Sequence, residues 1–538
     1  MVISDRGIVA TSQTLASQAG AQVLARGGSA IDAAIAANAT LGVVEPMMNG
    51  IGGDLFAMYW DAKTGKLTGL NASGWAPKGL TIEFLKSLGE KTMPQRGIQS
   101  VTVPGAVDGW AKLHERFGKL PWAELFQPAI YYAENGFPVT EIIQDGWQLN
   151  TSKLKGDENA RRIFLHDGKA PQVGEVFRNP QMAAAYRLLA GQGPAALYRG
   201  PLAQAILKTS GRLGGKMTAA DLSEYSAEWV QPISTEYRGW RVYEMPPNSQ
   251  GIAALEMLNL FAQFPFNEYF SRSTDELHIQ IEAQKLAYAD LERYVADPRF
   301  AKVPVDGMLS LGYARQRAKL IDQKKANCNV TPGKPLPGAG ETIYLSVVDR
   351  DGNIVSLIQS LFSDFGSAVV VDDYGFALHN RGGLFTLDAG HPNALAPRKR
   401  PFHTIIPGFM EKGNLHIGFG IMGGLNQAQA HAQFVSNVVD QEMNIQRALE
   451  TPRFRKITQT GCEVSIENRV PQDALEGLTA RGHVLKIIGD YSTGVGGGQA
   501  VMYDSTAKVK YGASDPRKDG AAVPEPPPYF ANPTRSAR

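Results

Sequence analysis

A break in composition beyond the middle of the chain divides it into two parts with different periodicity. Residues 331–340, TPGKPLPGAG, contain three prolines and three glycines, which predicts an exposed, irregular loop. Directly after it, residues 343–349 and 354–360 have the β-branched, apolar character of strands and are separated by the turn sequence Arg-Asp-Gly-Asn. The chain therefore changes here from a mostly helical part to a strand-rich part.

Periodicity and turn residues place the other regular elements. Apolar residues at helical spacing end at Gly27-Gly28, where a residue without Cβ suits a helix C-cap, and Ser29 starts an alanine-rich helix that should pack closely against a sheet. The Pro-rich tail after Asp519 is expected to form an extended strap or to be disordered. We expect one helix at 12–26, a second that starts at Ser29, helices through most of 103–323 (notably 275–295) and one at 427–439. We expect a strand at 55–61, a return strand that runs through Leu70, and strands at 368–372, 415–419, 484–488 and 499–503.

Charge balance and apolar runs exclude several classes of protein. The chain of 538 residues has 54 Lys+Arg against 52 Asp+Glu and no basic run interleaved with aromatics, so no nucleic-acid partner is expected. Its longest small-apolar run, 33–44, is shorter than the ~20 residues of a membrane span. The N-terminus lacks a basic segment followed by an apolar one, so no secretory signal is expected. Cys328 and Cys462 lie far apart, form no CxxC and provide no disulfide framework, which favours a reducing cytoplasm.

Most short catalytic motifs are missing from the sequence. There is no GxxxxGK[ST], HExxH, GxSxG or paired CxxC, and the nine histidines are scattered, so no metal site is expected. Gly418-Phe-Gly-Ile-Met-Gly423 matches GxGxxG between an expected strand and helix, with Asp440 downstream. The sequence after that helix reads as another helix rather than a parallel strand. A tight turn is therefore the favoured interpretation, and a dinucleotide-dependent oxidoreductase remains an alternative.

Thr342 stands at the junction between the loop and the first strand. If the peptide bond between Glu341 and Thr342 were cut, Thr342 would carry a free α-amine beside its hydroxyl. An α-amine has a pKa of about 7.7 to 8.0, so near neutral pH it can take the hydroxyl proton and activate the oxygen as a nucleophile. The alternative is a β-branched residue that simply begins a strand.

Motifs around this threonine and along the rest of the chain resemble one family. They agree in order from Gly27 to Arg517 with the γ-glutamyltransferase (γ-glutamyl transpeptidase) family of N-terminal nucleophile hydrolases. The matching segments are GGSAIDAA at 27–34, NGIGG at 49–53, VPGAVDG at 103–109, VYEMPP at 242–247, EAQKLAYAD at 282–290, TIYLSVVDRDGN at 342–353, FGS at 365–367, MGG at 422–424 and GASDPR at 512–517.

The resemblance implies a fold, a maturation step and a mechanism. The fold is α+β, a four-layer αββα sandwich, in which a precursor cuts itself into a large chain, 1–341, and a small chain, 342–538, that remain intertwined as a heterodimer. Thr342 then becomes acylated by an amide substrate, and water or an acceptor amine removes the acyl group. Gly423 and Gly424 match the pair whose backbone N–H groups stabilise the oxyanion. Ser360 matches a hydroxyl that hydrogen-bonds the nucleophile; an outward-facing strand serine is the alternative.

The substrate pocket departs from the glutathione-binding members. Their arginine for the glutamyl α-carboxylate falls on Ile82, and their three α-amine ligands fall on Phe362, Arg381 and Leu384. A serine pair becomes His403-Thr404. Because a charged α-carboxylate and ammonium would lose hydration without partners in such a pocket, efficient γ-glutamyl transfer is not expected.

Arg381 and His403 instead suggest a small acid amide or a non-glutamyl acyl group as substrate, since an arginine fork pairs well with a carboxylate. With the motifs Gly52-Gly-Asp54, Thr342-Ile-Tyr-Leu and His403-Thr-Ile-Ile-Pro407, the sequence looks like the cytosolic branch of the family that includes oxamate amidohydrolase. An ion pair ordering the turn at 380–383 is the alternative role of Arg381. No cofactor is implied, and whether two heterodimers pair stays open. The alternatives for the whole protein are a true γ-glutamyltransferase or glutathione hydrolase, the oxidoreductase above, and a non-catalytic binding protein that kept the fold.

Overall fold

Two seven-stranded sheets form the centre of the molecule. The computed structural model describes residues 1–330 and 341–529, without the side chains of 341–343. One sheet has the order β19-β2-β10-β11-β3-β4-β7 and the other β1-β18-β17-β13-β12-β9-β8. The strands of the first sheet are β2 Ile8–Thr11, β3 Asp54–Asp61, β4 Lys66–Ala72, β7 Glu228–Val230, β10 Glu341–Val348, β11 Ile354–Phe362 and β19 Ala521–Pro524. Those of the second are β1 Val2–Ser4, β8 Ile233–Tyr237, β9 Trp240–Glu244, β12 Gly408–Lys412, β13 Leu415–Ile421, β17 Gly498–Asp504 and β18 Val509–Ser514.

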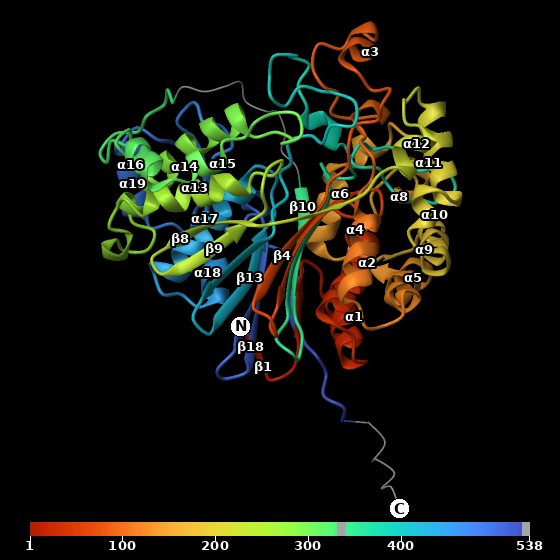
Figure 1. Ribbon diagram of the computed structural model, residues 1–538, viewed down its shortest axis with the longest axis horizontal. Helices are drawn as coiled ribbons and strands as arrows, with labels where there is room; N and C mark the ends of the chain where they lie inside the picture. Colours follow the sequence, from red (N-terminus) through yellow and green to blue (C-terminus); the bar gives the residue numbers. More distant parts are fainter. Residues whose placement is uncertain (331–340, 530–538) are drawn as a thin grey trace, which may run out of the picture.

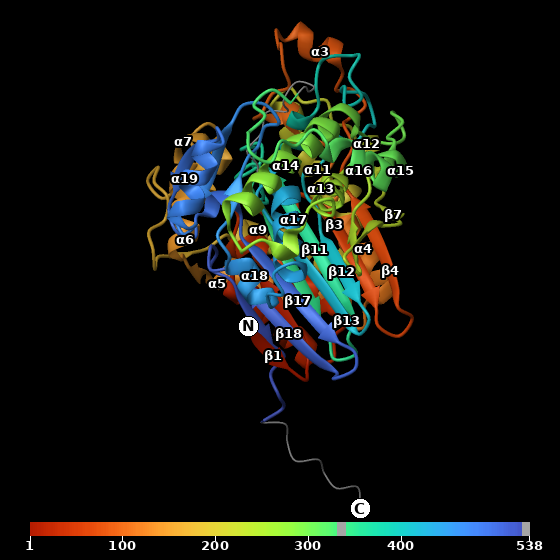
Figure 2. The ribbon, with the colours of Figure 1, turned by 90° about the vertical axis from the view of Figure 1, so that its left-hand side faces the viewer.

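Helices cover both outer faces, so the order of layers is αββα (Figure 1). Figure 2, turned by 90°, shows the second sheet with α17 and α18 in front of it. The first sheet is covered by α1 Thr14–Ala25, α2 Ala30–Val44 and α4 Ala106–Phe117, with α5 Gln127–Asn135 packed on α2 and α9 Pro180–Gln192 on α5. The second sheet is covered by α13 Gly251–Phe261, α17 Asn426–Val439 and α18 Ile445–Glu450, with α14 Thr274–Tyr294 packed on α13. Between the sheets lies an apolar layer that includes Phe56, Tyr344, Ile358, Phe409 and Val501. The expected four-layer sandwich is confirmed.

The residues of the central elements explain their positions. Every residue of β11 is buried, as expected for a strand with another layer on each face. Helix α2 is buried along its whole length, and its alanines let it lie close to β10 and β11. It begins with a capping box in which Ser29 and Asp32 satisfy each other's backbone N–H groups. The helices predicted on both sides of Gly27-Gly28 are confirmed as α1 and α2, and the hairpin after them is confirmed as β3 and β4.

Some other expectations from the sequence are changed by the structure. The predicted strand at 368–372 forms only an isolated bridge, Val370 with Ala377. Part of the proline-rich tail is a strap: β19 pairs antiparallel with β2, while residues 530–538 lie outside the described chain. The loop expected at 331–340 also lies outside it. The GxGxxG segment consists of the end of β13 and the first residues, 422–423, of the turn to α17. Because β13 pairs antiparallel with both neighbours, the segment does not open a parallel βαβ unit.

The two cysteines form a disulfide, Cys328–Cys462, with 4.9 Å between their Cα atoms. The expectation that these cysteines provide no disulfide is wrong, and the prediction of a reducing compartment loses the support it took from that expectation. The reason is that distance along the chain says nothing about distance in space: Asn329 forms a bridge with Thr460, which brings the two cysteine segments side by side. Among the described residues, no helix is long and apolar enough to cross a membrane.

Candidate active site

The candidate nucleophile lies at an irregular point of a central strand. Strand β10 begins at Glu341, between β2 and β11. Its register with β11 shifts between Glu341, which lies opposite Phe362, and Ile343, which lies opposite Gln359. Thr342 is the residue at this shift, and its side chain is outside the described part of the structure. Irregularities of this kind re-aim a side chain and are common beside active sites.

Strand β11 presents a second element of the site opposite that shift. The Ser360 hydroxyl accepts a hydrogen bond of 2.7 Å from the Phe362 N–H, and the Ser360 side chain is buried. Phe362 has a φ of 78°, a left-handed conformation that costs a bulky residue energy. Because its side chain is buried, Ser360 is not an outward-facing serine. The end of β11 is bent at Phe362, the residue paired with Glu341.

The glycine pair lies where β13 passes into α17. Gly423 and Gly424 have φ values of 124° and 60°, which favour glycine. Their carbonyl groups accept hydrogen bonds from the N–H groups of Asn426 and Gln427, at 3.0 and 3.2 Å, and so start the helix. The two glycine amides consequently lie at the positive end of the α17 dipole, an environment that favours negative charge.

Gln250 connects this glycine turn to the segment that carries Thr404. Its Nε2 donates a hydrogen bond of 2.8 Å to the Gly424 carbonyl and another to the Thr404 carbonyl. Gln250 is fully buried at the start of α13. Sequence reasoning did not identify it, and only its place just after the matching segment 242–247 points to it.

Arg381 is a buried cation with part of its hydrogen-bonding capacity free. Its Nη1 donates a hydrogen bond of 2.7 Å to the Thr404 hydroxyl, and its guanidinium carbon lies 4.8 Å from the centre of the Phe362 ring. Its Nε and Nη2 have no hydrogen-bond partner among the described residues. Burial lowers the pKa of Arg381 to about 9, against the raising effect of Asp54, so it is positively charged at neutral pH. Such a group fits a bidentate anionic ligand.

The alternative role of Arg381, an ion pair that orders the turn at 380–383, stays a prediction; among the described residues its electrostatic partner is Asp54, and the turn has a further support. Asn380 provides it through its side chain, which accepts a hydrogen bond from the Ser363 N–H and donates to the Gln95 carbonyl, at 3.0 and 2.8 Å.

A buried carboxylate, Asp54, opens β3 beside two histidines. Its Oδ2 is 2.9 Å from the His403 Nε2, its Oδ1 is 3.5 Å from the His379 Nε2, and its Oδ1 accepts a hydrogen bond from the Gly74 N–H at 3.2 Å. All of these side chains are fully buried. Burial raises the pKa of Asp54, but the two histidines and Arg381 outweigh it and lower the pKa below its ordinary value.

The two histidines are neutral donors toward Asp54. Burial and the nearby Arg381 lower the pKa of His403 to about 3, and burial also lowers the pKa of His379. The Nδ1 of His379 accepts a hydrogen bond from the Arg381 N–H, so its proton is on Nε2, on the Asp54 side. In the sequence, Asp54 stands out only as part of the motif Gly52-Gly-Asp54, and neither it nor His379 is assigned a site role from the sequence alone. The available signal was a charged residue, directly after Gly52-Gly53, that opens an otherwise apolar strand.

The structure brings most of the predicted pocket residues together, but not all of them. Phe362 and Leu384 are buried in the apolar cluster beneath α13 and α17. Ile82, by contrast, is the first residue of the short helix α3 Ile82–Ser87 and packs against a separate apolar cluster. That cluster consists of Ala76, Leu80, Leu85, Met93, Phe385, Leu387 and Leu395.

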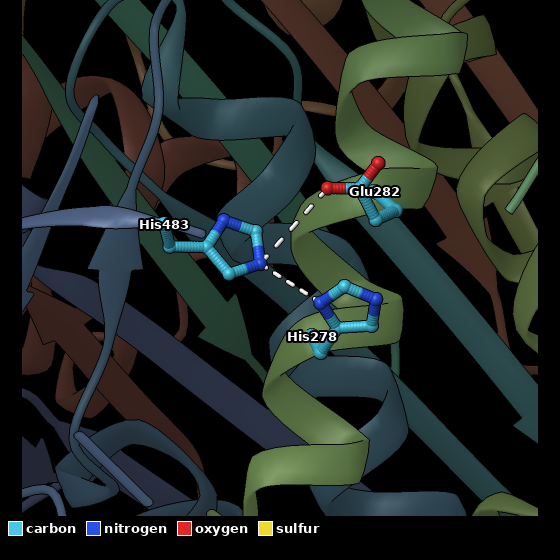
Figure 3. A group of neighbouring side chains, drawn as sticks. All are labelled: His278, Glu282 and His483. Atoms are coloured by element: carbon cyan, nitrogen blue, oxygen red, sulfur yellow. Dashed lines mark hydrogen bonds and ion pairs between the residues drawn. The ribbon is translucent and has the colours of Figure 1, made fainter. Parts of the chain in front are cut away.

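A second buried polar group lies away from this site, between α14 and the segment after α19 Gln472–Ala480 (Figure 3). His278, Glu282 and His483 have atoms within 4.8 Å of one another, the arrangement of metal ligands. The His278 Nδ1 is 2.9 Å from the His483 Nε2, and Glu282 forms an ion pair of 2.6 Å with the buried Lys285. Because an ammonium group already neutralises the carboxylate, this arrangement does not favour a divalent cation.

Comparison with known proteins agrees with this geometry. Residues 16–525 match the family model described as Gamma-glutamyltranspeptidase. The chain is 38% identical over 527 residues to the glutathione hydrolase-like YwrD proenzyme of Bacillus subtilis, covering 97% of this chain and 99% of that one. It is 33% identical to the oxamate amidohydrolase proenzyme of Klebsiella pneumoniae, with the same coverage.

A solved structure, cephalosporin acylase from Bacillus halodurans, is 43% identical and superimposes with a TM-score of 0.91 over 97% of this chain and 96% of that one. The family model and these relatives span nearly the whole chain. The protein therefore belongs to the gamma-glutamyltranspeptidase family of N-terminal nucleophile hydrolases.

Proposed function

We propose that this protein is a self-processing amidohydrolase that uses Thr342 as its nucleophile and acts on amides whose acyl group carries a carboxylate. The peptide bond before Thr342 is cut, which gives a large chain, 1–341, and a small chain, 342–538. The observation that carries the substrate assignment is the buried Arg381, which has two donor nitrogens unpaired among the described residues. Its guanidinium group lies over the ring of Phe362, and Phe362 is the residue of β11 that lies opposite Glu341.

The free α-amine of Thr342 takes the proton of its own hydroxyl, and the oxygen attacks the amide carbonyl carbon. Negative charge develops on the carbonyl oxygen, where the N–H groups of Gly423 and Gly424 would stabilise it; one such donor is worth about 3 to 4 kcal/mol. The amine leaves with the proton held by the α-ammonium. Water then adds to the Thr342 ester and releases the acid, and an acceptor amine in place of water would give transfer. Ser360 is proposed to orient the hydroxyl.

The charges of the pocket support a non-glutamyl acyl group. A γ-glutamyl group carries both a carboxylate and an ammonium, and an ammonium next to Arg381 would be repelled. Phe362 and Leu384 offer it only apolar surface. An acyl group with a carboxylate and no ammonium would use the free donors of Arg381 without that cost. Monoamides of short dicarboxylic acids, from oxamate upward, have this chemistry.

The large and small chains are expected to stay together after cleavage. In support, strands of the two chains pair with each other in the first sheet: β2 lies between β19 and β10, and β11 lies next to β3. Pairing of two heterodimers remains open, and a cytoplasmic location remains a prediction, now without the support of unpaired cysteines.

A substrate panel tests the proposed acyl specificity. The panel contains oxamate, succinamate and glutaramate, the neutral amides of matching length, and a γ-glutamyl anilide. For wild type we expect kcat/KM to be at least about 30-fold higher for one acid amide than for its neutral counterpart, because a desolvated charge pair is worth about 2 to 5 kcal/mol.

Two variants make the panel specific to the arginine. In Arg381→Met the acid-to-neutral ratio should fall close to one, whereas in Arg315→Met, at an exposed position on α16 Leu311–Ala318, it should stay unchanged. The ratio is taken within each variant, so loss of folded protein does not affect it. Preferential turnover of the γ-glutamyl anilide by wild type would instead identify a glutathione hydrolase.

A further inference from the structure

The last described segment of the proposed large chain is fixed onto the small chain. The segment before residue 331 runs beside residues 460–462: the Gly461 N–H donates a hydrogen bond of 2.9 Å to the Cys328 carbonyl, and Asn329 forms a bridge with Thr460. Ala326 donates from its N–H to the Arg481 carbonyl at 2.7 Å. Several backbone contacts therefore dock this segment in one position.

The disulfide Cys328–Cys462 lies within this docked segment. Cys328 precedes the proposed cut between Glu341 and Thr342, and Cys462 follows it. We propose that in the processed enzyme this disulfide is a covalent bond between the large and small chains, an inference that rests on the cleavage proposed above. In the precursor the same bond would only close a loop within one chain.

The surroundings of the bond suit its formation. Lys285 is fully buried; its Nζ lies 3.9 Å from the Cys462 Sγ and donates a hydrogen bond of 3.0 Å to the Asn327 carbonyl. The same Lys285 also pairs with Glu282, so one buried ion pair contacts both cysteine segments and holds them in place. Two thiols lose two electrons and two protons when the bond forms, and a low-molecular-weight or protein disulfide accepts them and is reduced to two thiols.

Such a bond matters most once the enzyme has been unfolded. Two unlinked chains must find each other again, and recovery then depends on their concentration. A covalent link makes reassembly intramolecular, at an effective concentration of about the millimolar range. The linked enzyme should therefore recover its activity after denaturation equally well at high and low protein concentration.

Intact mass measured under denaturing conditions tests the link. Purified wild type is equilibrated with oxidised glutathione, its free thiols are blocked with iodoacetamide, and it is denatured with and without reductant. Without reductant we expect one species, heavier than the uncut chain by the water added at cleavage; with reductant, chains 1–341 and 342–538 should separate. Cys462→Ser and Cys328→Ser should give two separate chains even without reductant, with unchanged activity before denaturation.

The outcomes separate this inference from the proposed cleavage. A single uncut chain in reductant would mean that cleavage fails, and the interchain bond would fall with it. Cleaved wild type that separates without reductant, or that takes up iodoacetamide on both cysteines, would overturn the interchain bond and leave the cleavage intact. Recovery after denaturation adds a functional comparison: dilution from about 10 µM to about 0.1 µM should lower the recovered activity of Cys462→Ser at least several-fold and leave that of wild type unchanged.

Discussion

The His403 Nε2 lies 2.9 Å from the Asp54 Oδ2 although the two residues are 349 positions apart in the sequence. This contact joins the start of β3 to the segment that carries Thr404, the hydrogen-bond partner of Arg381. Burial leaves the histidine neutral, and the ionised Asp54 offsets the charge of Arg381. Asp54 is bound by neutral histidines and not directly by Arg381, so the guanidinium group of Arg381 keeps donors available to a ligand.

Replacing Asp54 by Asn should destabilise the protein strongly, because it leaves the charge of Arg381 without its buried counterpart. We expect the free energy of unfolding to fall by about 3 to 5 kcal/mol. Urea denaturation of Thr342→Ala and of Asp54→Asn/Thr342→Ala measures this in uncut chains. As a control, Asp351→Asn removes the acceptor of an exposed ion pair with Lys119 and should change stability by less than about 1 kcal/mol. Equal effects of the two variants would show that Arg381 does not depend on Asp54.

Replacing Gln250 by Leu should impair the chemical step more than substrate binding. Its side-chain amide holds the Gly424 and Thr404 carbonyls in place, so the variant misplaces the oxyanion donors without removing them. We expect kcat to fall about 10- to 100-fold, less than for deletion of an oxyanion donor, and KM to change by less than about threefold. Gln263→Leu, at the end of α13 where the amide caps only the Asn259 carbonyl, is the matched control. An unchanged kcat in Gln250→Leu would mean that the turn at Gly423-Gly424 keeps its conformation without the Gln250 side chain.

Stability should decrease as the pH falls below about 6.5, the ordinary pKa of histidine. In the folded protein the pKa of His403 is about 3, so between these values the unfolded chain binds a proton that the folded chain does not. Each such histidine contributes a loss of up to about 1.4 kcal/mol per pH unit. His483, whose pKa burial also lowers to about 3, should act in the same way.

His483→Gln separates this effect from the active site. Between pH 6 and 4 its unfolding free energy should change with pH less steeply than that of wild type, by the slope that corresponds to about one bound proton. Its activity at pH 7.5 should stay as in wild type. A pH slope identical to that of wild type would show that His483 takes up its proton in the folded state.

The sequence predicted the layers and the central strands because these depend on ordered motifs and on local pattern. The strand at 484–488 coincides with β16 Val484–Ile488, and the N-cap at Ser29 is as expected. The strand expected at 368–372 fails although it is apolar, because Phe365, Gly366 and Ala368 have left-handed backbone conformations that interrupt an extended chain. Long-range pairs could not be predicted: the disulfide and the Asp54 contacts join distant segments, and no local pattern encodes such proximity.

The most direct test of the central claim is the intact mass of wild type, Thr342→Ser and Thr342→Ala, each measured after reduction. We expect wild type to give two chains, the smaller beginning Thr-Ile-Tyr-Leu, and Thr342→Ser, which keeps a hydroxyl, to be cut at the same bond. Thr342→Ala should remain a single uncut chain without amidase activity. A wild type that stays uncut, a smaller chain with any other first residue, or cleavage in Thr342→Ala would contradict the assignment of Thr342 as the nucleophile.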